Sequence, residues 1–309
     1  MKKILIGFIL SIILIATYSI VGNYFIQNKV EEKSAQYENL DINVGFSYLN
    51  PLSGVVLNNV TLKNKSVDKS FSIDKVVLKE FNGFLNSNFI IEGIYIEEKD
   101  LPKGFLNKNI RELLFNKDKA VNISFEFNNT LSEENNLNLN LDLSLKNKFD
   151  ILLNGQLNNF DTEKYNSLPQ PSEGTYMLYL TMVNNLLKET LLKDFSLTFL
   201  NQGIVNDVLE GSKDNVNRFK DMSTEKIKEE MVSMVDMQIK REPLFIKRKL
   251  FNEYKILLEN ENYAHISISP EDPKPMTDVI VDVLSSQKQP EPNYILFREA
   301  YQKQTSQFN

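Results

Sequence analysis

The chain has 309 residues, 42% hydrophobic and 25% charged, with a formal net charge of -6 at pH 7. This length suits one large domain or two small ones. The acidic balance argues against a nucleic-acid surface, which needs a basic excess. Because there is no cysteine, disulfides, thiolate catalysis and cysteine-based metal sites are excluded.

Residues 4–21 form an uncharged apolar run directly after Lys2 and Lys3. A helix of about 18 to 20 apolar residues spans the hydrocarbon core of a bilayer. The sequence therefore predicts a membrane anchor with a short cytoplasmic tail at residues 1–28. Two alternatives stay open: a cleaved signal peptide, although no Ala-x-Ala site follows, and a buried core helix. The anchor residues are Ile4, Leu5, Phe8, Ile12, Ile15 and Val21.

No later apolar stretch reaches bilayer length. The two lysines before the anchor favour a cytoplasmic N-terminus by the positive-inside bias. We therefore expect a single-pass protein of the bacterial inner membrane with the bulk of the chain in the periplasm.

Residues 29–166 are predicted to form a β-rich extracytoplasmic region. Apolar and polar residues alternate in short runs, such as 42–48, 56–62 and 71–77, and a period of two is typical of half-buried strands. No long helical crossover separates these runs, so the strands should be antiparallel with short links. The expected result is a twisted antiparallel sheet, with a groove-like shape as one option.

The clearest alternation is NLNLNLDLSLKNKFDILLNGQLNNF at residues 136–160. Burying one such apolar side chain stabilises a protein by about 1.5–3 kcal/mol, so the apolar side of this stretch should be covered. Helices of the same chain, an acyl chain in an open groove, and a partner protein or membrane surface are the alternatives. We call this predicted surface the leucine face; it comprises Leu137, Leu139, Leu141, Leu143, Leu145, Ile151, Leu153 and Leu157.

Residues 167–309 are predicted to form an α+β region that packs on the sheet. Two prolines and a glycine at 167–174 mark the change. Helical spacing follows at 176–191, at 227–239 behind a possible Ser223 cap, and at 251–258 behind Pro243. Strands are expected at 194–203 and 264–269, and Thr277 is a candidate cap for a last amphipathic segment.

Candidate sites for chemistry are few. The chain has a single histidine, His265, whereas a catalytic triad or a histidine-based metal site needs more partners. Carboxylates adjacent in sequence, such as Glu229 and Glu230, point apart on a helix. No glycine cluster forms a phosphate cradle. The sequence predicts no catalytic residue, no cofactor and no metal.

Two further patterns favour ordinary packing or solvation. A methionine stripe could be an adaptable binding surface, but core packing is the simpler interpretation; it consists of Met222, Met231, Met234 and Met237. The basic segment at 247–251 is either a solvated helix face or a contact for anionic lipid head groups.

Several segments together resemble AsmA-like bacterial envelope proteins, in particular their smaller membrane-anchored relatives. After the predicted anchor come VGFSYLNPLSGVVLNNVTLKN and SIDKVVLKEF, and later LTFLNQGIVNDVLE and EYKILLENENYAHISISPEDPKPM. The first is a strand, an Asn-Pro-Leu-x-Gly turn and a second strand, and the second is a third strand. In the later two, a strand ends in Gly before a helix and a helix leads into a strand ended by Pro-x-x-Pro. The resemblance implies a periplasmic β-rich groove, a lipid or envelope-biogenesis role and no catalytic residues.

The expected fold is thus α+β: an N-terminal transmembrane helix, then a twisted antiparallel β-sheet packed with amphipathic helices from the C-terminal half. The expected function is non-enzymatic lipid binding or envelope organisation at the inner membrane. Phospholipid and another envelope protein are the candidate partners. An anchored extracytoplasmic sensor or partner-binding module is the alternative, and a hydrolase using spatially assembled carboxylates is a third.

Overall fold

A computed structural model describes residues 23–30, 32, 40–50, 54–64, 69–81, 85–101, 111, 114–115, 119–169, 175–259, 262–285 and 295–297. They form antiparallel strands and several helices, which confirms the predicted α+β class and antiparallel sheet. The chain divides into two compact units, Met1–Phe127 and Asn128–Asn309. This division falls inside one strand, Ala120–Leu131, and the predicted change of region after residue 166 falls inside the second unit.

The first unit is built on strands in chain order. β1 (Leu40–Asn50), β2 (Gly54–Asn64), β3 (Lys69–Phe81) and β4 (Ser87–Glu97) pair antiparallel, each with the next. A short 3-10 turn, Glu98–Asp100, follows β4, and β5 (Ala120–Leu131) is next to β4 in the sheet order. The short links between β1 and β4 agree with the meander expected from the sequence.

Helical residues 23–30 pack on this sheet. Ile26 and Val30 belong to a core with side chains of β1, β2 and β3, including Val44, Val60 and Ile73. The same helix also makes a polar contact, because the amide oxygen of Asn23 accepts hydrogen bonds from the backbone N–H and the hydroxyl of Ser47 at 2.8 and 2.5 Å. Strands and helix therefore share one core in this unit.

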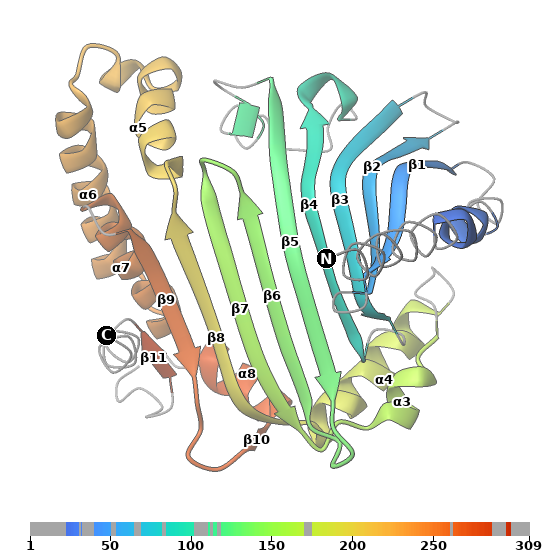
Figure 1. The fold of residues 1–309 in the computed structure, drawn as a ribbon. Helices are drawn as coiled ribbons and strands as arrows, with labels where there is room; N and C mark the ends of the chain where they lie inside the picture. The colour runs from blue at the N-terminus through green and yellow to red at the C-terminus, as the bar shows by residue number, and fades with distance from the viewer. Residues whose placement is uncertain are drawn as a thin grey trace, which may run out of the picture. The chain divides into compact units, whose positions relative to one another are not determined.

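The second unit continues the strand series. The sheet order runs through β6 (Leu137–Leu145), β7 (Phe149–Asn158), β8 (Leu191–Asn201), β9 (Tyr263–Ile268) and β11 (Ile295–Phe297), while the short β10 (Lys274–Pro275) pairs with β8. Figure 1 shows β6 to β9 side by side. β8 and β9 come from the C-terminal region, so that region extends the sheet as well as supplying helices.

The second unit contains the helices predicted from spacing at 176–191, at 227–239, at 251–258 and near Thr277, with shifts at their ends, and also short helical segments at 162–166 and 217–219 that were not predicted. They are α3 (Thr162–Asn166), α4 (Tyr176–Glu189), α5 (Ile204–Asn215), the 3-10 turn η2 (Asn217–Phe219), α6 (Thr224–Arg241), α7 (Phe245–Leu258) and α8 (Met276–Ser285). The Ser223 cap is confirmed, since its hydroxyl oxygen accepts from the N–H of Lys226 at 3.3 Å. Thr277 lies inside α8 and not before it, because the helix begins at Met276, whose N–H donates to the carbonyl of Thr190.

These helices form two separate cores. Residues of α5, η2, α6 and α7 pack on one another around Leu209, Phe219, Ile227, Val235 and Leu258. A smaller core joins α8 to the sheet through Val279, Leu192 and Ile268. Most of the amphipathic helices thus bury their apolar sides against each other.

Residues 1–22 of the predicted anchor segment 1–28 lie outside the described residues, and with them Ile4, Leu5, Phe8, Ile12, Ile15 and Val21. The last part of that segment, residues 23–28, belongs to the helix that packs on the sheet of the first unit. Among the residues that the structure does describe, no helix is both long enough and apolar enough to span a bilayer.

Candidate functional site

The leucine face forms the centre of the second unit's sheet. β6 and β7 pair so that Leu137 is opposite Leu157, Leu141 opposite Leu153 and Leu143 opposite Ile151. Side chains directly opposite in an antiparallel pair share one side of the sheet. The register therefore brings the predicted residues of the two strands together on one surface.

That surface continues onto β8 and β9. Leu153 is opposite Leu197, and Leu197 is opposite Ile266. One pair further along, Ile151 is opposite Phe199, whose ring stacks on Phe149 with centroids 5.4 Å apart. These strands were predicted, but their place beside the leucine face was not, because strand order is not encoded in alternation.

Burial differs between the ends and the middle of the leucine face. Leu137 and Leu145, at the two ends of β6, have exposed fractions of only 1% and 5%. The residues between them are partly exposed, as are Ile151 and Leu153 on β7 and Leu197 and Phe199 on β8. The middle of the face is therefore less well covered than its ends.

One end of the face is covered by α8. Leu157 and Phe195 pack against the small core that Val279 of α8 forms with Leu192 and Ile268. The helices α5, α6 and α7 pack around their own core. The predicted cover by C-terminal helices is thus present at the α8 end, and Leu141 and Leu153 belong to neither of the two cores described for this unit.

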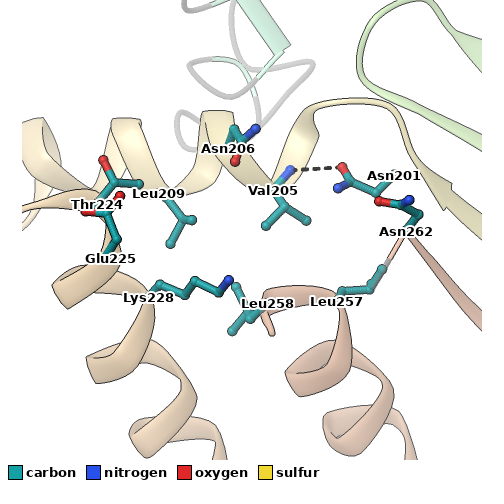
Figure 2. A pocket seen from close by; sticks show the side chains of 10 residues that line it. All are labelled: Asn201, Val205, Asn206, Leu209, Thr224, Glu225, Lys228, Leu257, Leu258 and Asn262. Atoms are coloured by element: carbon teal, nitrogen blue, oxygen red, sulfur yellow. Dashed lines mark hydrogen bonds between the residues drawn. The ribbon is translucent and has the colours of Figure 1, made fainter. Parts of the chain in front are cut away.

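A cavity of about 500 Å³ lies at the other end of β8, between α5, α6 and α7 (Figure 2). Val205 and Leu209 point into it from α5, and Leu257 and Leu258 line it from α7. Polar side chains complete the lining: Asn201, Asn206, Thr224, Glu225, Lys228 and Asn262. A volume of this size is within the range of small-ligand pockets, which combine an apolar lining with a few polar groups.

Asn201 connects this cavity to the sheet. It follows Phe199 by two positions on β8 and is opposite Phe149, so alternation places it on the same side of the sheet as the leucine face. Its amide oxygen accepts from the N–H groups of Gly203 and Val205 at 3.1 and 3.3 Å, which satisfies the first turn of α5. The backbone N–H of Asn201 donates to the carbonyl of Asn262 at 2.7 Å.

Charged groups of both signs meet at the α6 side of the cavity. Hydrogen bonds from its own backbone N–H and from Ser223 lower the pKa of the Glu225 carboxyl, and the nearby Lys213 and Lys228 lower this pKa further. Figure 2 shows Lys228 extending from α6 toward α7. An adjoining hollow of about 310 Å³ shares Glu225 and Lys228 with the cavity. Its other lining residues are Glu229, Val232 and Glu259.

His265 lies on the opposite side of the sheet and is buried. Its Nδ1 is 2.7 Å from the hydroxyl oxygen of Thr198 on β8, and its backbone N–H donates to the carboxylate of Glu253 on α7 at 3.4 Å. Desolvation lowers the pKa of His265, while the charge of Asp194 raises it. The ring of His265 is therefore neutral and hydrogen-bonded to Thr198 inside the protein, as expected of a structural histidine.

The methionine stripe has a mixed outcome. Met222, Met231 and Met234 pack on the α5–α7 core, as the packing interpretation predicts. Met237 is exposed instead. Among the described residues, no group of three or more His, Cys, Asp or Glu side chains is placed to hold a metal ion.

No protein-family model matches the chain, and no curated protein matches it in sequence. The resemblance to AsmA-like proteins therefore stays a prediction.

Proposed function

We propose that this protein is a non-enzymatic, membrane-anchored envelope protein that binds phospholipid on its leucine face. The observation that carries the proposal is the partial exposure of Leu141, Ile151, Leu153 and Leu197, which form one side of three adjacent strands. Large contiguous apolar surfaces on proteins usually mark interaction sites. Full burial of an exposed side chain of this kind stabilises by about 1.5–3 kcal/mol. These side chains are partly exposed, so an apolar ligand that covers them gains part of this free energy from each.

The shape of the apolar surface suits an acyl chain. The segment of β8 from Phe195 to Asn201 extends over about 20 Å, at a rise of about 3.3 Å per residue. A bilayer hydrocarbon core is about 30 Å thick, so one leaflet of acyl chains covers about 15 Å. The strand is long enough to lie along a lipid tail.

The N-terminal sequence supports a location at the membrane. The uncharged run at 4–21 follows two lysines, and insertion of such a run as a helix satisfies all its backbone groups internally. A chain anchored in this way would hold its folded region near the periplasmic leaflet, where phospholipid is available.

A second candidate, a partner-binding module, is favoured by α4. Its first turns expose Tyr176, Met177, Leu178 and Leu180, with fractions from 41% to 74%. The whole stretch from Tyr176 to Leu187 has no charged residue. An exposed helix of this composition also suits a contact with another envelope protein.

Lipid extraction separates the two candidates. The full-length chain is purified in mild detergent, and its phospholipid content is measured by mass spectrometry. We expect one phospholipid per chain in the native protein. In Leu153→Asp the amount of bound phospholipid should fall at least about tenfold, because binding of the acyl chain would remove the new carboxylate from water.

The matched control is Asn154→Asp, one residue along β7 on the exposed polar side. It should retain the lipid. A native protein without phospholipid, or equal lipid loss in both variants, would contradict the proposal, and a stable protein partner without lipid would favour the second candidate.

A further inference from the structure

The cavity between α5, α6 and α7 starts where the leucine face ends. Asn201 lines the cavity and lies two positions beyond Phe199 on the same side of β8. The apolar surface and the polar cavity are therefore adjacent parts of one unit. A molecule with an apolar tail along β8 would bring its polar end to Asn201.

The floor of the cavity remains apolar, and its rim is polar. Leu209 and Leu258 are almost fully buried, with exposed fractions of 3% and 1%, and they line the cavity together with Val205. The side-chain amides of Asn206 and Asn262 each offer donors and an acceptor. Such a lining accommodates the glycerol and first methylene groups of an amphiphile beside a hydrogen-bonding head.

Charges of both signs select the chemistry of that head. Glu225, Glu229 and Glu259 line the cavity or the adjoining hollow, and Lys228 lines both. Glu259 is also 3.7 Å from Lys255. Glu225 and Glu229 are the lining carboxylates that lie on α6 together with Lys228. A head group with negative charge alone would meet these carboxylates, whereas a head with a phosphate and an ammonium can pair with both signs.

We infer that this cavity and the adjoining hollow together bind the head group of a zwitterionic phospholipid with a primary amine. The ammonium donates hydrogen bonds to Glu225 and Glu229, and Lys228 pairs with the phosphate. Charge-assisted bonds of this kind are the strong ones, and only an amine with N–H groups can donate them. The inference rests on the proposed function, since it assigns the head group of the lipid that the leucine face holds.

Head-group competition tests the inference. The full-length protein is delipidated in detergent and incubated with vesicles. The vesicles contain equal amounts of phosphatidylethanolamine, phosphatidylcholine and phosphatidylglycerol with identical acyl chains. The repurified protein is then analysed by mass spectrometry. We expect the ethanolamine lipid to be enriched at least about fivefold over each of the others.

Variants on α6 assign the preference to the cavity. The double variant Glu225→Gln/Glu229→Gln should reduce the enrichment to less than about twofold while the total bound lipid stays the same. The control is Glu230→Gln, which lies on the same helix and lines neither hollow; it should keep the full preference.

The outcomes distinguish the two proposals. Bound lipid without a preference for ethanolamine, or a preference that survives the double variant, overturns the head-group inference and leaves the proposed function intact. Absence of any bound lipid overturns the proposed function itself, and the inference with it.

Discussion

Leu141 occupies the middle of the leucine face, opposite Leu153, and its side chain is only partly covered. Leu141→Asp should lower the free energy of unfolding by about 1–3 kcal/mol, because a carboxylate would replace an apolar contact. Complete burial, as the sequence alone suggests, would give a larger loss. Urea unfolding of the two proteins measures the difference.

Asn140→Asp is the control for this change. Asn140 is exposed and lies on the polar side of β6, so its replacement should alter the free energy of unfolding by less than about 0.5 kcal/mol. Equal unfolding midpoints for the two variants would show that the register assignment is wrong.

His265 should make stability depend on pH. Burial lowers the pKa of His265 below the ordinary value of 6.5. As the pH falls, the imidazole is therefore protonated at a higher pH in the unfolded chain than in the folded chain. The stability from the neutral ring is present above pH 6.5 and is lost as the pH falls through the lowered pKa, with a slope of at most about 1.4 kcal/mol per pH unit.

Denaturation curves between pH 7 and pH 5 test this for the native protein and for His265→Gln. The carboxylates are common to both, so their titration cancels in the comparison. The native protein should lose more stability across this range than the variant. Parallel stability curves would mean that His265 titrates alike in the folded and unfolded chain.

A buried ion pair connects the β6–β7 turn to α5. Lys148 donates to the carboxylate of Asp207, and both side chains are almost inaccessible. The carbonyl of Lys148 also accepts from the N–H groups of Gln202 and Ile204 at 2.9 and 3.0 Å. The turn is thus joined to the end of β8 and the start of α5 by side-chain and backbone bonds.

Lys148→Met should lower the free energy of unfolding by about 3–5 kcal/mol, because Asp207 would lose its buried cationic partner. The double variant Lys148→Met/Asp207→Leu should recover most of this loss, since it leaves no buried charge. Chemical denaturation of the three proteins measures both effects. A double variant as unstable as the single one would contradict the role assigned to this pair.

The elements themselves follow from local sequence signals. The leucines of β6 alternate with asparagines, Ser223 caps α6, and the spacing after Tyr176 repeats as a helix. Each of these signals acts within a few residues. The α+β class and the antiparallel strands were therefore predictable.

The site was predictable only in part, because its other half depends on contacts between distant residues. The register of β6 and β7 brings the predicted leucines together, but the place of β8 beside β7 has no local signal. The cavity joins Asn201, Lys228 and Asn262 from three segments, and the pair Lys148–Asp207 spans 59 positions. The periodicity of a single segment does not predict contacts between residues that are distant in sequence.

If the chain is an anchored periplasmic protein, residues 4–21 stay in the mature protein as a membrane anchor. Intact mass spectrometry of the native chain should give a mass that includes these residues. Protease added to spheroplasts should digest the folded region without lysis. A chain that begins near Asn23, or a folded region that resists protease until lysis, would contradict the anchored periplasmic arrangement.

Site-specific photo-crosslinking tests whether a phospholipid lies on the leucine face. A photoreactive residue is placed at Leu153 in one full-length protein and at Asn154 in another, and both are irradiated in native membranes. We expect a phospholipid adduct at position 153 and none at position 154, because the two side chains lie on opposite sides of β7. Equal adducts at both positions, or only a protein adduct at position 153, would contradict this expectation.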